Sequence, residues 1–138
     1  MALTLPVWIN TARQDVGDPG GTAEFPSGAS GAIKIRTFGD AASESDSPGI
    51  PRGLICGVRA TCSADAGTVT IRVYNDDAKT DEVYNAALDL SATPFKSSHQ
   101  PVQPIPFFGP VYFTIQCSTD PNANVFVTFY VKAMAGNG

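Results

Sequence analysis

The last third of the chain contains two runs in which large apolar residues alternate with polar or amphipathic ones. They span residues 110–117 and 125–132, and a polar turn from Ser118 to Asn124 separates them. A period of two places every second side chain on the same face of a β-strand. We therefore expect one face of each run to line a core, and the two runs to pair as an antiparallel hairpin.

Strands are also expected upstream, where short runs are rich in β-branched and aromatic residues. These runs are Leu3 to Ile9, Ala32 to Phe38, Gly53 to Cys62, Thr68 to Asn75 and Glu82 to Leu90. The run at 82–90 could also form a helical turn, but its alternation favours a strand. Gly, Pro, Asp and Ser residues predict long loops over 10–30 and 39–51, an irregular segment over 91–103, and a hairpin-type connection at 63–67.

About seven or eight short strands with no persuasive helix predict an all-β fold, an antiparallel β-sandwich of jelly-roll or immunoglobulin-like type. The immunoglobulin order of Cys, Trp and Cys is absent, because Trp8 precedes every cysteine. A length of 138 residues suits a single domain. Within it we expect an extended N-terminal arm and loop at 1–30 and the sandwich at 31–138.

The chain is poor in charge. Charged residues make up 16% of it, against about 25% in an average protein. Such a surface suits permanent contacts between proteins, but it also fits a β-protein that is simply rich in Ser, Thr and Gly. The net charge is −4, and no cluster of basic residues could neutralise a run of phosphates, so we expect no direct nucleic-acid binding. The basic residues are scattered at Arg13, Lys34, Arg36, Arg52, Arg59, Arg72, Lys79, Lys96 and Lys132.

The N-terminus has no positively charged region ahead of its short apolar run, so we expect no secretory signal and folding in a cytoplasm. No run approaches the roughly 20 apolar residues that span a bilayer. A basic amphipathic stretch is also absent, and we expect no contact with membranes.

No catalytic constellation is visible. His99, the only histidine, is expected to be a solvated loop residue, and there is no Gly-x-Ser-x-Gly elbow. The acidic segment 76–82 could offer oxygen ligands to calcium, but Lys79 opposes a cation, so a solvated turn is expected. Cys56, Cys62 and Cys117 suit reduced, buried thiols rather than a zinc site, and one cross-strand disulfide could form in an oxidising medium. We therefore predict no catalytic residue, no metal, no cofactor and no enzymatic activity.

The residues expected to contact partners are Val7, Trp8, Phe25, Tyr112 and Tyr130. Trp8 could fill the core or anchor the arm on a neighbouring subunit. Tyr112 and Tyr130 fall on the opposite strand faces from the expected core residues. They could be exposed, and this leaves open a glycan-binding module for host or surface recognition as the alternative function.

Three passages resemble small β-sandwich accessory proteins of tailed bacteriophage virions, which are capsid decoration, cement or tail-associated proteins. They are Thr70-Ile-Arg-Val-Tyr-Asn-Asp, Gln103-Pro-Ile-Pro-Phe-Phe-Gly-Pro-Val-Tyr-Phe and Asn124-Val-Phe-Val-Thr-Phe-Tyr-Val, and they cover about the last 70 residues. The resemblance implies a non-enzymatic structural role in the virion, assembly in the host cytoplasm, contacts with the major capsid protein or other virion proteins, and many copies, often as trimers. It identifies no binding residue.

Overall fold

The computed structural model describes residues 9–27, 31–35 and 53–133. Within these ranges the chain forms nine strands and no helix, and so none that could cross a membrane. The strands are β1 (Ile9–Gly17), β2 (Ile33–Lys34), β3 (Gly53–Cys62), β4 (Gly67–Tyr74), β5 (Glu82–Leu90), β6 (Lys96–His99), β7 (Ile105–Phe107), β8 (Tyr112–Cys117) and β9 (Val125–Ala133). The expectation of an all-β fold is confirmed.

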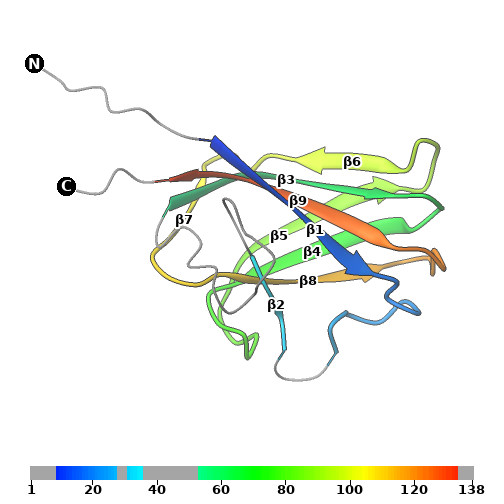
Figure 1. Ribbon diagram of the computed structural model, residues 1–138, viewed down its shortest axis with the longest axis horizontal. Coiled ribbons are helices and arrows are strands. Elements are labelled where there is room, and N and C mark those ends of the chain that lie inside the picture. Colours follow the sequence, from blue (N-terminus) through cyan, green and yellow to red (C-terminus); the bar gives the residue numbers. More distant parts are fainter. Residues whose placement is uncertain (1–8, 28–30, 36–52, 134–138) are drawn as a thin grey trace, which may run out of the picture.

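The strands form two antiparallel sheets (Figure 1). One has the order β1-β9-β3-β6, with β7 pairing the same edge of β3 as β6, and the other has the order β2-β8-β4-β5. When β6 and β7 are counted as one interrupted edge strand, each sheet has four strands. In each, a strand from the beginning of the chain pairs with one from the end, β1 with β9 and β2 with β8. This is the strand order of a jelly roll, in which two Greek keys interleave.

The expected hairpin between the last two long strands is wrong. β8 pairs with β4 in one sheet, whereas β9 lies between β1 and β3 in the other. The segment 118–124 therefore crosses from one layer to the other. The segment 63–66 between β3 and β4 does the same, so the hairpin-type connection expected at 63–67 is also wrong. Alternation predicts which face of a strand is buried. It does not predict whether two strands that both face the core pair within one sheet or pack against each other from opposite sheets.

The core lies between the two sheets and is filled by apolar side chains. Phe113 of β8 and Phe129 of β9 are both fully buried, and their ring centroids lie 5.0 Å apart in an edge-to-face arrangement. Such a contact adds to the burial of the two rings. The apolar face expected for each of these strands is confirmed.

Strand positions agree best where the apolar pattern is strongest. β3 and β5 match their expected ranges, whereas the loop expected over 10–30 is wrong for residues 10–17, which continue β1. The irregular segment expected over 91–103 is also wrong in part, because it contains β6. Both missed strands are held by pairing at a sheet edge, with β9 and β3 respectively, so tertiary context outweighs weak local preference.

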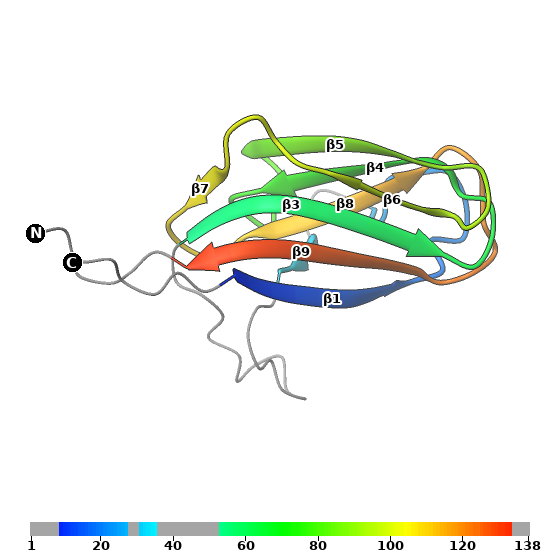
Figure 2. The ribbon, with the colours of Figure 1, turned by 90° about the horizontal axis from the view of Figure 1, so that it is seen from above.

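One end of the sandwich gathers the start of β1, the start of β3, the end of β9 and β7 (Figure 2). Gly53 pairs with Phe107 on one side and with Ala133 on the other, and Ile9 pairs with Lys132. We call this the β7 end. The segments 63–66, 91–95 and 118–124 lie at the opposite end (Figure 2).

Candidate functional site

The structure does not bring the expected contact residues together. Val7 and Trp8 lie outside the described residues, so their role stays a prediction. Tyr112 and Tyr130 are both half-buried on outer faces, but Tyr112 belongs to the β2-β8-β4-β5 sheet and Tyr130 to the other. Because the two rings lie on opposite sides of the sandwich, they do not form the single aromatic platform that the glycan-binding alternative needs.

Phe25 is part of the fold. Its backbone N–H donates to the carbonyl of Ile115 at 2.7 Å, and the Ile115 N–H donates back at 2.8 Å. This bridge extends the edge of β8 beyond its pairing with β2, and the half-buried Phe25 side chain packs against the core. Phe25 therefore anchors the segment that follows β1.

Glu24, next to that anchor, is the centre of a polar cluster on the outer face of the β2-β8-β4-β5 sheet. Its Oε2 accepts hydrogen bonds from Thr114 Oγ1 at 2.8 Å and Tyr74 Oη at 3.0 Å, and it lies 3.5 Å from Arg72 Nη1. Arg72 also donates to Gln116 Oε1 at 3.0 Å. Thr114 is fully buried, so Glu24 satisfies a hydroxyl group that water does not reach.

The same contacts shift the titration of Glu24 and Tyr74. Partial burial raises the pKa of Glu24, but the hydrogen bonds from Thr114 and Tyr74 and the charges of Lys79 and Arg72 outweigh it, and they hold the pKa below the ordinary 4.5. Burial and the neighbouring Glu24 carboxylate raise the pKa of Tyr74. The cluster therefore places the carboxylate of Glu24 beside the neutral phenol of Tyr74. These contacts hold the segment 22–25 against the sheet.

Glu24→Gln should make the free energy of unfolding depend less on pH in the acid range. A carboxyl group whose pKa is lower in the folded state stabilises the fold above its unfolded pKa, near 4.5, and this stabilisation is lost as the pH falls through the folded value. Denaturant unfolding at pH values from about 6 to 3 should show a steeper loss for the wild type than for the variant. Glu82→Gln is the control, because Glu82 also lies beside Arg72, at 3.7 Å, but has no hydroxyl donor. Equal slopes for the wild type and Glu24→Gln would contradict this role.

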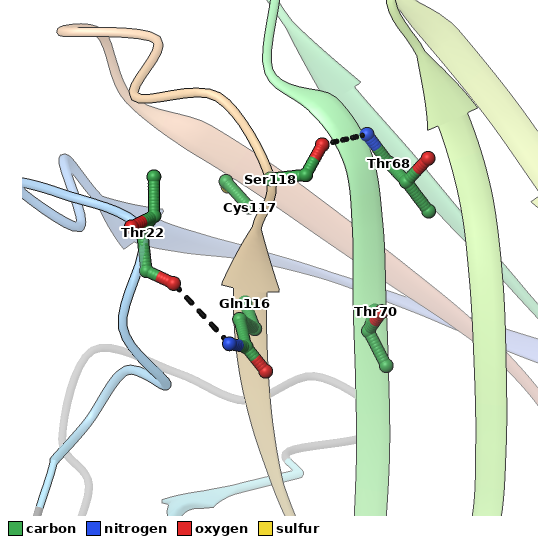
Figure 3. Close-up of a pocket in the computed structure, with 6 residues that line it drawn as sticks. All are labelled: Thr22, Thr68, Thr70, Gln116, Cys117 and Ser118. Carbon is green, nitrogen blue, oxygen red and sulfur yellow. Dashed lines mark hydrogen bonds between the residues drawn. The ribbon is translucent and has the colours of Figure 1, made fainter.

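An open depression of about 490 Å³ adjoins this cluster at Gln116 (Figure 3). It is lined by Thr22, Thr68, Thr70, Gln116, Cys117 and Ser118. Gln116 Nε2 donates to the carbonyl of Thr22 at 3.2 Å, and Ser118 Oγ accepts from the Thr68 N–H at 2.8 Å. These internal bonds join the loop and the two strands, and the lining contains no charged side chain that could select a ligand.

The expectation that His99 is a solvated loop residue is wrong. His99 ends β6 and pairs with the fully buried Val58, so its half-buried ring faces inward. There it hydrogen-bonds through Nδ1 to the hydroxyl group of Tyr84 in β5, with the ring centroids 5.6 Å apart. Burial raises the pKa of Tyr84 to about 12. The pair joins the edges of the two sheets through a phenol that stays neutral at ordinary pH.

The acidic turn, residues 75–82, and the cysteines were considered as metal ligands from the sequence. Asp76 accepts hydrogen bonds from the N–H groups of Thr80 and Asp81, at 3.1 and 3.0 Å from its Oδ1, so it closes the turn expected there. Across the described ranges, no three metal-ligating side chains come together. All three cysteines are free thiols, and burial, with smaller contributions from nearby acidic groups, raises the pKa of Cys117 to about 11.

Among the described residues, the exposed large apolar side chains lie in a proline-rich segment that includes β7. Phe108 is 73% exposed and Val102 is fully exposed, while the neighbouring Phe107 is buried in the core. The segment 101–110 also contains four of the eleven prolines, whose restricted φ stiffens it. We call it the β7 loop. Sequence reasoning missed both residues, because Val102 and Phe108 lie in bends on either side of the short strand β7, where no strand period marks them.

No family model and no curated protein matches this sequence. Among solved structures, the chain is similar to that of the giant freshwater prawn Macrobrachium rosenbergii extra small virus (XSV) virus-like particle, determined by cryo-EM. The identity is 15%, the match covers 98% of this chain and 85% of that chain, and the TM-score is 0.40. The assignment of a jelly roll rests on the strand order of this chain itself.

Proposed function

We propose that this chain is a non-enzymatic structural protein of a virion, a capsid decoration (cement) or head–tail accessory protein that acts through contacts between protein surfaces. The exposed β7 loop carries this proposal. A large aromatic side chain that is 73% exposed on a stiff segment costs solubility, unless a partner covers it. The adjacent Phe107 anchors the segment in the core, so Phe108 is presented from a rigid base.

Two further features support action by surface contact. The space between the sheets is packed with apolar side chains, and the depression on the outer face is open and has no charged side chain in its lining, so it suits contact with a surface better than enclosure of a small molecule. The resemblance in the last 70 residues points to accessory proteins of bacteriophage virions. Attachment to a major capsid protein, a trimeric state and an arm at residues 1–8 that reaches a neighbour belong to the same proposal.

Phe108→Ser combined with Val102→Ser should remove the chain from virus particles. Particles purified on a density gradient from the culture that produces them should carry the wild-type chain at a fixed copy number, measured by quantitative mass spectrometry. The double variant should be depleted at least tenfold, because a buried aromatic anchor commonly contributes about 2 kcal/mol or more to a contact. Its free energy of unfolding should stay within about 0.5 kcal/mol of the wild type, since both side chains are exposed.

Tyr112→Ser is the comparison, because Tyr112 begins β8 just after the β7 loop but lies on the outer face of the β2-β8-β4-β5 sheet. Particles that keep the double variant but lose Tyr112→Ser would move the contact to that face. Particles that never contain the wild-type chain would refute the proposed function.

A further inference from the structure

Four basic side chains that are far apart in the sequence share the outer face of the β1-β9-β3-β6 sheet. Arg13 of β1 and Arg59 of β3 pair with Thr128 of β9 from its two sides, and cross-strand partners point to the same face. Lys96 of β6 and Lys132 of β9 join them by the alternation of their strands. We call these four residues the basic face. Among the described residues, none of the four forms an ion pair with a carboxylate.

Two aromatic rings, those of Phe126 and Tyr130, share this outer face with the charges. The Cζ atom of Arg13 lies 4.3 Å from the ring centroid of Phe126, in a cation–π contact. A Cβ atom on Gly57 would lie 3.4 Å from Cδ2 of Tyr130, so this ring lies close along the sheet. Arginine and aromatic residues are enriched in protein interfaces. Because Arg13 covers one face of Phe126, that ring is poorly placed to stack on a nucleic-acid base, and a protein partner is favoured.

The remainder of the molecule has the opposite charge. The four cations of the basic face lie near one carboxylate, Asp15, which gives this face a net charge of +3. The other described residues contain three cations and nine carboxylates, a net charge of −6. The greatest concentration of these carboxylates is the acidic turn, residues 75–82, with four carboxylates and Lys79. Asp77 in this turn is exposed, so it is available to a partner.

We propose that the basic face binds the acidic turn of a second copy of this chain. The acidic turn joins β4 and β5 of the other sheet, so a chain does not present it to its own basic face. The contact joins two different surfaces of the same protein and is therefore heterologous, and it closes into a ring when the rotation between copies permits, a trimer included. This inference deepens the proposed function and rests on it, because it names one surface through which the subunits meet.

The contact should be sensitive to salt, because both of its surfaces are charged. Light scattering at low concentration of salt, about 20 mM, should give a mass above the 14.4 kDa of one chain. At about 500 mM salt the mass should fall toward that of one chain, because the charges are screened over a few ångströms. A single-chain mass at low salt and at every protein concentration would overturn the inference.

Charge reversal on each surface separates this contact from other associations. Arg13→Glu with Arg59→Glu, and Asp77→Lys with Glu82→Lys, should each weaken self-association at least tenfold. An equimolar mixture of the two double variants still contains one intact basic face and one intact acidic turn, so it should associate under conditions in which neither variant associates alone. A mixture that stays monomeric, while circular dichroism shows both variants folded, would overturn the inference.

Lys34→Glu is the matched control, since it reverses a half-buried strand cation on the other sheet and should keep the wild-type mass. If a double variant does not fold, Arg59→Gln in the same assay replaces it and should lower the mass at low salt. Salt-dependent binding of labelled oligo(dT) that Arg13→Glu with Arg59→Glu abolishes would assign the basic face to nucleic acid and overturn the inference. Unchanged self-association of both double variants, together with normal incorporation into particles, would refute this interface and leave the proposed function standing.

Discussion

Phe129→Ala should lower the free energy of unfolding by about 3–5 kcal/mol, the usual cost of emptying a fully buried aromatic site. Phe129 has no exposed surface, and its ring contacts Phe113 across the two sheets, at 5.0 Å between centroids. Alanine would remove the buried ring and the edge-to-face contact together and leave a cavity between the layers. Chemical denaturation in guanidinium chloride measures the loss, and the salt screens contacts between copies.

Phe126→Ala is the control on the same strand. Phe126 lies on the outer face of β9, half-buried beneath the guanidinium group of Arg13. Its replacement should cost about 1 kcal/mol, from the cation–π contact and partial burial. Equal losses for the two variants would mean that β9 does not separate a core face from an outer face, and would contradict the sandwich.

Gly67→Ala should lower the free energy of unfolding by about 3 kcal/mol, the sum of left-handed backbone strain, a lost hydrogen bond and local repacking. Gly67 has a φ of +66°, and a Cβ atom there would lie 2.2 Å from Ser118 Oγ and 2.8 Å from Thr119 Oγ1. Ser118 would have to move away and give up its 2.8 Å hydrogen bond with the Thr68 N–H. Denaturant unfolding of the variant measures the cost.

Gly17→Ala is the control for Gly67→Ala, because both glycines have a positive φ. Gly17 has a φ of +85°, but no atom lies within 4 Å of an added Cβ. Its replacement should cost only the conformational strain, about 1–2 kcal/mol. Adding Ser118→Ala to Gly67→Ala should cost little more, because the same hydrogen bond is already lost. Additive losses, or equal losses at the two glycines, would show that Ser118 does not restrict Gly67.

The local sequence pattern was sufficient to predict a strand where apolar residues recur with the strand period of two. The ranges of β3 and β5 follow directly from the alternation over 53–62 and 82–90, and so do the inward faces of β8 and β9. The pattern was insufficient for β1 and β6, whose polar sequences form strands because β9 and β3 offer free edges to pair with. An edge strand obtains its hydrogen bonds from its neighbour, and it carries little apolar signal of its own.

The residues of the candidate surfaces were likewise predicted in part from the sequence, and in part only the fold shows where they lie. Tyr112 and Tyr130 were correctly expected on outward faces, but the side of the sandwich on which each lies depends on the crossing of the segment 118–124. His99 resembled a loop residue because its partner, Tyr84, is brought to it by β5 of the other sheet. Phe108 was missed because it directly follows the end of β7, and only the burial of Phe107 in the fold shows which ring of the Phe-Phe pair is exposed.

The sequence by itself determined the all-β class, the apolar faces of the long strands and the low content of charged residues. Each of these depends only on residue type and a period of two along the chain. Only the tertiary structure decided which strands share a sheet, since both Greek keys of a jelly roll require pairings between distant segments that no local pattern encodes. For the same reason, only the fold could gather scattered Arg13, Arg59, Lys96 and Lys132 on one face and leave the acidic turn on the other sheet.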